Sequence, residues 1–148
     1  MIYLSEINGD NYKAIIRLSV NEDQKPYVAS NSVILAKAYA YRLEGGTALG
    51  IFEDGTAVGL ISYRILDNSC ILDQFMIDKR FQGKGFGKEA LSIFIEAGKK
   101  EGKCNKIILC FIEGDKVAEA LYKSYGFVII DRDEAEDEPA EIIMERFL

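Results

Sequence analysis

The segment from residue 80 to residue 88 has the residue types and spacing of an anion-binding turn. It reads Arg80-Phe81-Gln82-Gly83-Lys84-Gly85-Phe86-Gly87-Lys88, after an apolar β-type run and before an amphipathic helical pattern. Glycines at alternate positions leave main-chain N–H groups open to close approach, and the following helix adds the positive end of its dipole. The two lysines add charge. The turn therefore predicts a pyrophosphate site, with a tight turn selected for backbone geometry as the structural alternative.

Two common pyrophosphate motifs fit this turn poorly. A Walker A loop needs Ser or Thr after Gly-Lys, but Glu89 follows Gly87-Lys88. The dinucleotide fingerprint can be written as Gly85-x-Gly87-x-x-Ala90. However, the next strand ends Leu109-Cys110-Phe111, with no acidic residue at the expected distance to hold a ribose. Nicotinamide binding is therefore the weaker hypothesis.

The residues missing from the sequence exclude several kinds of catalysis. The chain of 148 residues contains no histidine, which excludes Ser-His-Asp and Cys-His catalysis and zinc sites that use imidazole. It has 3 cysteines and no C-x-x-C motif. An odd number without that spacing argues against a disulfide framework and a four-thiolate metal site, and fits a reducing compartment. We expect no metal.

Charge and hydropathy limit the partners and the location. The net charge of −6 argues against nucleic-acid binding and favours a cationic partner. The longest apolar run, Ile107 to Ile112, is far shorter than the ~20 residues of a membrane helix, and no signal peptide is visible. We expect a cytoplasmic protein with no nucleic-acid or membrane partner, and a homodimer stays open. The acidic run from Asp131 to Glu141 is interpreted as a solvated loop or as a rim that attracts cations.

Periodicity and turn signals predict the element order β-α-α-β-β-β-α-β-α-β-β in a single domain, residues 1–148. Strands are expected at Ile2–Glu6, Thr47–Phe52, Ala57–Ile65, Cys70–Ile77, Lys106–Phe111, Phe127–Ile130 and Ile142–Phe147. Helices are expected from caps at Asn8–Asn11 to Leu18 or Val20, from Ser30–Ser32 to just before Gly45, over Gly85–Lys100 with Gly102 as C-cap, and over Lys116–Tyr125. Asn21–Ser30, which contains Pro26, is expected to be a loop. Antiparallel strands followed by one crossover predict a mixed α/β sheet covered by helices.

Two motifs resemble those of the GNAT superfamily of acetyl-CoA-dependent N-acetyltransferases. Gln82-x-x-Gly85-x-Gly87 is similar to the family's coenzyme A loop, Q/R-x-x-G-x-G/A. Further on, Asp115-x-x-Ala118-x-x-Leu121-Tyr122-x-x-x-Gly126-Phe127 resembles N-x-x-A-x-x-L-Y-x-x-x-G-F, with Asp115 in place of the usual Asn. A carboxylate at this position can still cap the helix that follows. The resemblance implies a GNAT-like acyl-CoA N-acyltransferase fold, with about seven strands in a mixed sheet flanked by four helices. It also implies acetyl-CoA as the co-substrate.

Two shorter segments resemble bacterial spermine/spermidine acetyltransferases. They are Gln24-x-x-Tyr27-Val28-Ala29-x-Asn31 and Phe75-Met76-Ile77-Asp78. This resemblance implies that the acceptor is a small cationic amine, with spermidine or spermine favoured. A protein N-terminus or lysine side chain is the alternative acceptor. A module that binds coenzyme A without turnover is the alternative from a different functional class.

The family resemblance implies that the amine attacks the acetyl thioester directly in a ternary complex. The pantetheine arm would lie along the end of the strand before the turn, and a main-chain N–H near Met76 would donate to the thioester oxygen. The cofactor-binding residues implied in this way are Phe75, Met76, Ile77, Gln82, Gly83, Lys84, Gly85, Phe86, Gly87, Lys88 and Asp115.

The chemistry also needs a proton acceptor and a proton donor. An ammonium with a pKa of ~10.4 is only about 0.1% neutral near pH 7.4, which costs roughly 4 kcal/mol unless the site helps. Without histidine the base must be a carboxylate, a tyrosine or a water. We take Asp73 as the candidate, with a solvent-facing strand residue as the alternative. Tyr122 matches the family's general acid, which protonates the departing thiolate; a helix-packing aromatic is its alternative.

A polyamine keeps further ammonium groups, which need their own partners. Glu22 and Asp23 are candidate carboxylates, and Tyr27 and Tyr39 are candidate cation–π walls. For each of these residues, the alternative interpretation is an ordinary surface or packing side chain.

Overall fold

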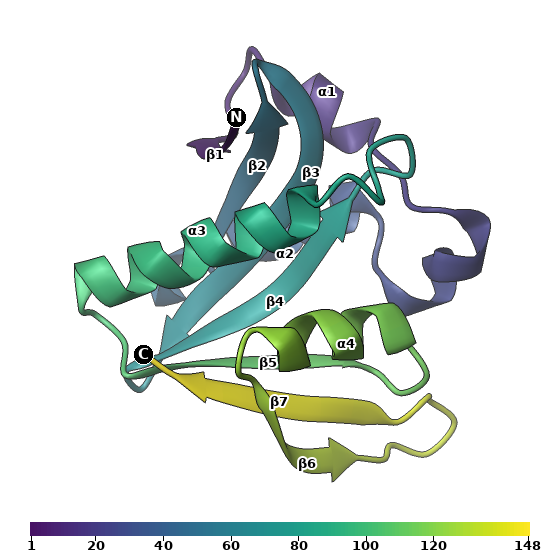
Figure 1. The fold of residues 1–148 in the computed structure, drawn as a ribbon, viewed down its shortest axis with the longest axis vertical. Coiled ribbons are helices and arrows are strands. Elements are labelled where there is room, and N and C mark those ends of the chain that lie inside the picture. The colour runs from purple at the N-terminus through teal and green to yellow at the C-terminus, as the bar shows by residue number, and fades with distance from the viewer.

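All seven strands join in one mixed sheet with the order β1-β2-β3-β4-β5-β7-β6 (Figure 1). The computed structural model describes residues 1–148. β4 and β5 run parallel, and every other neighbouring pair is antiparallel. The strands are β1 (Ile2–Glu6), β2 (Thr47–Glu53), β3 (Thr56–Leu66), β4 (Ser69–Ile77), β5 (Lys106–Ile112), β6 (Val128–Asp133) and β7 (Glu141–Phe147). The mixed α/β class predicted from the sequence is confirmed.

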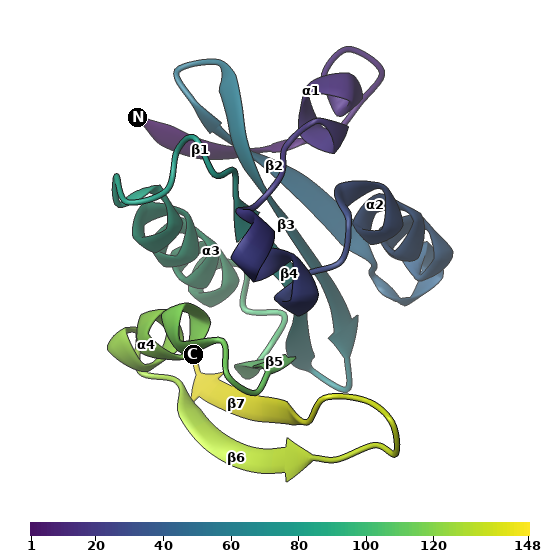
Figure 2. The ribbon, with the colours of Figure 1, turned by 90° about the vertical axis from the view of Figure 1, so that its right-hand side faces the viewer.

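Helices cover both faces of the sheet, α1 and α2 on one face and α3 and α4 on the other (Figure 2). The larger apolar cluster contains Phe94 of α3 and Tyr122 of α4. The smaller one contains Ile15 of α1 and Ile34 of α2. The helices are α1 (Tyr12–Ile16), α2 (Asn31–Ala40), α3 (Phe86–Glu101) and α4 (Lys116–Ser124), with 3₁₀ helices η1 (Glu22–Tyr27) and η2 (Arg42–Glu44). None of these helices has the length and apolar character needed to cross a membrane.

Three of the predicted elements were wrong. The helix expected to continue to just before Gly45 ends at Ala40, and the separate 3₁₀ helix η2 follows it. The first helix ends at Ile16 rather than at Leu18 or Val20, because the Ser19 main chain is bonded to the segment after β4 instead of continuing the helix. The segment predicted as the loop Asn21–Ser30 contains η1, whose start is stabilised by reciprocal hydrogen bonds between Asn21 and Gln24. The Gly102 C-cap is confirmed, in the left-handed conformation with φ +65°.

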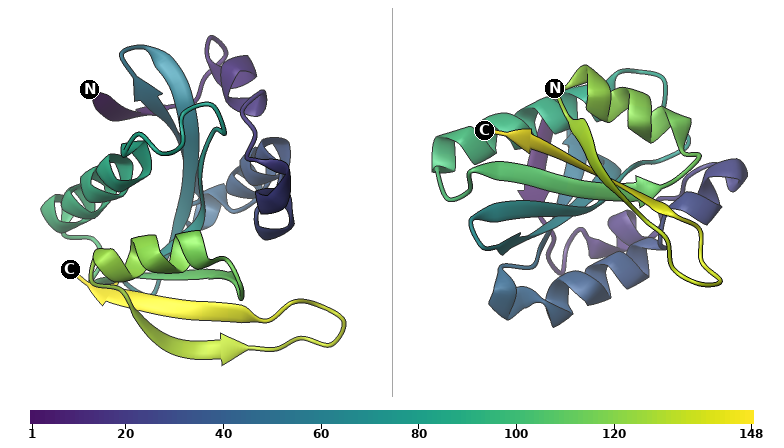
Figure 3. Two further views of the ribbon diagram at one scale, coloured as in Figure 1. Left: turned by 45° about the vertical axis from the view of Figure 1, so that its right-hand side comes forward. Right: turned by 90° about the horizontal axis from the view of Figure 1, so that it is seen from below.

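The pairing of β4 with β5 ends halfway along β4. It runs from Ser69–Lys106 to Leu72–Leu109 and no further. At the same point the register of β4 against β3 shifts, because Ser62 pairs with Gln74 and Tyr63 pairs with Leu72, which leaves Asp73 in a bulge. Figure 3 shows β5, β7 and β6 turning away from β2, β3 and β4. From Asp73 onwards, the β4 edge that faces β5 therefore has no strand partner.

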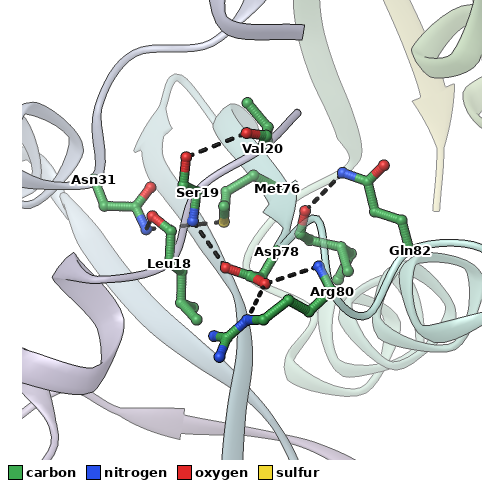
Figure 4. Close-up of polar contacts among 9 residues, drawn as sticks. Leu18, Ser19, Val20, Asn31, Met76, Asp78, Arg80 and Gln82 are labelled. Atoms are coloured by element: carbon green, nitrogen blue, oxygen red, sulfur yellow. Dashed lines mark hydrogen bonds and ion pairs between the residues drawn. The ribbon is translucent and has the colours of Figure 1, made fainter. Parts of the chain in front are cut away.

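Asp78, directly after β4, ties the end of the strand to two other segments (Figure 4). Its buried carboxylate accepts hydrogen bonds from the Ser19 main chain, the Arg80 main chain and the Arg80 guanidinium at 2.8–2.9 Å. Burial alone raises the pKa of Asp78, but hydrogen bonds from the Arg80 side chain and the Ser19 and Arg80 main chains outweigh it and hold the pKa below its usual value.

We expect Asp78→Asn to lower the free energy of unfolding by about 1.5–3 kcal/mol at neutral pH, because it removes a charged acceptor of three hydrogen bonds. Denaturant titration measures this loss, with the exposed Asp10→Asn as the control. A depressed pKa contributes stability that is present above the unfolded value of ~3.9 and is lost as the pH falls through the folded value. The difference between wild type and Asp78→Asn should therefore shrink below about pH 4. A difference that persists unchanged at low pH would contradict this explanation.

Candidate active site

A cavity of about 280 Å³ opens where β4 and β5 diverge. Its walls come from β4, β5, α4, the start of β7 and the segment that precedes α2. Five residues singled out from the sequence lie together in it: Tyr27, Asp73, Phe75, Asp115 and Tyr122. The other lining residues are Pro26, Val28, Ala29, Leu72, Gln74, Cys110, Phe111, Ile112, Ala118 and Glu141.

Tyr122 occupies the apolar part of the cavity. Its side chain is 7% exposed and packs against Phe111 and Phe127, with ring centroids 6.1 and 5.7 Å apart. Burial raises the pKa of the phenol, and the nearby Asp115 and Cys110 raise it further. The hydroxyl group is therefore neutral at physiological pH and retains a proton that it can donate.

α4, which carries Tyr122, is held at both ends. At its start, Asp115 Oδ1 accepts a hydrogen bond from the Ala118 main chain at 3.1 Å, which confirms the expected cap. At its end, the Tyr125 hydroxyl donates to the main-chain oxygen of Lys88 at 2.8 Å, so that α4 is tied to the first turn of α3. The position of Tyr122 thus depends on the element that follows the glycine turn.

Asp73 lies in the bulge of β4, and its carboxylate is already engaged by two cations. Lys37 Nζ lies 3.7 Å from Oδ1, and Arg64 Nε lies 3.4 Å from Oδ2. The side chain is only 13% exposed, which is contrary to the alternative of a solvent-facing strand residue. Asp73 thus lines the cavity with its carboxylate paired to two cations of the protein.

The glycine turn has the backbone that its sequence predicts. Gly83 and Gly85 adopt φ values of +77° and +84°, and a Cβ atom at either position would meet nothing within 4 Å. Open space in front of a glycine backbone at the start of the 16-residue helix α3 fits the diphosphate of coenzyme A. Lys84 and Lys88 are exposed beside it, whereas Phe86 and Gly87 are half-buried.

The unpaired edge of β4 fits the other part of the cofactor. Asp78 N donates to Val58 O at 2.8 Å, and antiparallel strands exchange hydrogen bonds at alternate pairs. Met76 is therefore bonded to Leu60 of β3, while the main-chain groups of Phe75 and Ile77 face the open side. An extended pantetheine arm can add along this edge. The main-chain N–H groups that face the open side near Met76 are therefore those of its neighbours, Phe75 and Ile77.

The side chain of Gln82 is engaged within the protein. Its amide nitrogen donates to Gln24 Oε1 and to the main-chain oxygen of Ile77, both at 2.9 Å. Both contacts hold the turn against the neighbouring segments. The Gln82 side chain therefore supports the backbone of the candidate cofactor site through contacts within the protein.

Three of the predicted acceptor residues lie outside the cavity lining. Glu22 is exposed and pairs with Lys25 at 2.6 Å, and Asp23 is exposed beside it. Tyr39 is 67% exposed, with the guanidinium of Arg42 over its ring at 4.1 Å. The structure does not bring these three side chains to the cavity.

Two cavity residues were missed by the sequence analysis. Glu141 begins β7, where it pairs with Ile112 of β5, and Cys110 lies two residues earlier on β5. The only available signal for Glu141 was its position at the end of the acidic run, immediately before an apolar strand. The protein has no group of three or more His, Cys, Asp or Glu side chains that could hold a metal ion.

Comparison with known proteins gives matches over most of the chain. Residues 8–127 match the model of the acetyltransferase (GNAT) family. The chain is 33% identical over 137 residues to a spermine/spermidine N(1)-acetyltransferase of Bacillus subtilis, covering 85% of this chain and 87% of the relative.

Solved structures share the fold at lower identity. The PaiA N-acetyltransferase of Thermoplasma acidophilum in complex with coenzyme A superposes with a TM-score of 0.77 at 20% identity, covering 100% of this chain and 99% of the other. The ribosomal-protein-S18-alanine N-acetyltransferase of Escherichia coli gives 0.77 at 19% identity, covering 99% and 94%.

We expect Gly85→Val to abolish binding of coenzyme A, because a branched side chain would fill the open space of the turn and is disfavoured at φ +84°. Calorimetric titration with coenzyme A measures this loss. Gly55→Val is a matched control, since Gly55 has a φ of +87°, its Cβ would also meet nothing within 4 Å, and it lies in the turn between β2 and β3. Undiminished binding by a folded Gly85→Val protein would show that the cofactor lies elsewhere.

Proposed function

Because the chain belongs to the acetyltransferase (GNAT) family and is an acetyl-CoA-dependent N-acetyltransferase, we propose that its acceptor is a polyamine such as spermidine or spermine. The observation that carries this proposal is the presence of three carboxylates, Asp73, Asp115 and Glu141, in one cavity beside Tyr122. A multiply charged amine needs one partner near its reacting nitrogen and others for its remaining ammonium groups. The identity to the Bacillus subtilis enzyme supports the same acceptor class.

We assign the two substrates to different parts of the site. The glycine turn, Gln82–Lys88, would hold the diphosphate of acetyl-CoA, and the β4 edge at Phe75–Ile77 would hold its pantetheine arm. When bound, acetyl-CoA supplies the thioester whose acetyl group is transferred. The acceptor would enter along the carboxylates of the same cavity.

Glu141 is the carboxylate most available to the acceptor. Asp115 caps α4, and Asp73 is paired with Lys37 and Arg64. No lysine or arginine of the chain forms an ion pair with Glu141. A substrate ammonium can therefore bind Glu141 without displacing a cation of the protein.

The side chains divide the proton transfers between two walls of the cavity. On the β4 side, Asp73 takes the proton of the attacking amine, directly or through a water. On the α4 side, the neutral Tyr122 donates a proton to the sulfur when its bond to the acetyl carbon breaks. Burial is the main cause that raises the pKa of the Cys110 thiol to about 11 and that of Cys70 to about 12. Neither cysteine offers a thiolate at neutral pH, which favours direct transfer to the amine.

Thiol release from acetyl-CoA tests the proposal against a panel of spermine, spermidine, diamines, aminoglycosides and lysine-containing peptides. We expect saturable turnover with spermidine and spermine. As a control on the chemistry, Tyr122→Phe should lower kcat by about 10²-fold or more, with little change in acetyl-CoA affinity. Turnover with peptides alone would overturn the polyamine acceptor. No turnover at all with tight acetyl-CoA binding would favour a non-catalytic module.

We expect Glu141→Gln to raise the KM for spermidine roughly threefold to tenfold, because it removes a partner of a substrate ammonium worth about 1 kcal/mol. The KM for acetyl-CoA should stay unchanged. Glu138→Gln is the matched control: it makes the same change in net charge in the same acidic run but lies outside the cavity. If the two variants raise the KM for spermidine equally, Glu141 acts only through the overall electrostatic field of the acidic run and not by direct contact with the substrate.

A further inference from the structure

The segment that precedes α2 forms one wall of the cavity and is bonded to the glycine turn. Pro26–Ala29 line the cavity, and Gln24 lies in η1 just before them. Gln24 Oε1 accepts from Gln82 Nε2, whose nitrogen also donates to the main-chain oxygen of Ile77, each at 2.9 Å. Asn21 Nδ2 donates to Gln82 Oε1 at 3.3 Å. We call Asn21, Gln24 and Gln82 the amide clamp.

The amide clamp contacts both parts of the proposed acetyl-CoA site. Gln82 immediately precedes Gly83 of the turn, and Ile77 O belongs to the unpaired edge of β4. At the other end, the clamp continues into η1, which carries Tyr27 into the cavity. A Cβ atom at Gly114 would lie 3.6 Å from the Tyr27 hydroxyl, so this ring reaches the loop before α4. The wall therefore extends from the glycine turn to the α4 side of the cavity.

The chain just before η1 is held to the end of β4 independently of the amide clamp. Lys79 N donates to Ser19 O at 2.8 Å, and Ser19 N donates to Asp78 at 2.9 Å. These bonds hold the chain before η1 to the end of β4. Loss of the Gln24–Gln82 bond would therefore release η1 without detaching the segment from the sheet.

We propose that the amide clamp couples the two substrate sites: coenzyme A at the turn fixes Gln82, and Gln24 then holds η1 and Tyr27 in the position that receives the acceptor. The inference rests on the proposed polyamine acceptor. Gln24 and Gln82 act as positioning residues, since they influence the acceptor through Tyr27. Coupling between two ligands is reciprocal, so spermidine must strengthen coenzyme A binding by the same factor.

Calorimetry with coenzyme A and spermidine measures the coupling without turnover, because coenzyme A carries no acetyl group. In the wild type we expect saturating coenzyme A to tighten spermidine binding by about fivefold or more. Gln24→Met removes the oxygen acceptor and should reduce this factor to below about twofold. Gln24→Glu keeps an oxygen at the same place and should restore the coupling. Lys25→Met, on the exposed side of η1, should retain the wild-type factor.

Hydrogen exchange of residues 22–27 gives a readout that does not depend on the acceptor. Coenzyme A should slow exchange there in the wild type and in Lys25→Met but not in Gln24→Met. Equal protection and equal coupling in Gln24→Met and the wild type would overturn the proposal that the amide clamp couples the two substrate sites. If spermidine fails to bind the wild type at all, the polyamine acceptor is wrong, and the exchange measurement with coenzyme A alone still decides the clamp.

Discussion

The end of pairing between β4 and β5 is the constraint on which the rest of the site depends. Four residue pairs join the two strands, from Ser69–Lys106 to Leu72–Leu109, and the bulge at Asp73 then turns β4 away. An interrupted parallel pair leaves main-chain donors and acceptors without strand partners, and such groups are costly to leave unsatisfied. A ligand with an amide-bearing arm can satisfy them. The same divergence opens the cavity, which Tyr122 and the end of β4 line together.

The open edge is stable because other contacts hold its two sides apart. On the β4 side, Asp78 receives three hydrogen bonds just beyond the strand, and Gln82 occupies the oxygen of Ile77. On the β5 side, α4 is capped by Asp115 and is tied to α3 by Tyr125. Because these contacts are polar and lie at the ends of β4 and α4, they hold the two sides of the cavity without filling it with side chains from the core.

The features that could be predicted from the sequence are those encoded by neighbouring residues. The glycine turn, the Asp115 cap and the Gly102 C-cap each depend on backbone preferences within a few positions, and the structure contains all three. The engagement of Asp73 by Lys37 and Arg64 joins three separate elements, and no local pattern indicates it. Glu141 enters the cavity only because β7, which begins at the end of the acidic run, pairs with β5. Glu22 and Asp23 are candidate ammonium partners by residue type and by their place before the second helix, but η1 leaves both side chains exposed.

The charges of the cavity follow from how each wall is built. Tyr122 is surrounded by Phe111 and Phe127, and this apolar environment favours the uncharged phenol. The opposite wall holds Asp73 between two cations of the protein, so a substrate ammonium near it must compete with Lys37. Glu141 has no such competitor, and this asymmetry favours an acceptor with at least two ammonium groups. One ammonium can bind at Glu141 while the amine to be acetylated remains near the β4 edge. Under the proposed function, a flexible polycation would use both positions, whereas a peptide whose only amine is its N-terminus would leave Glu141 without an ammonium partner.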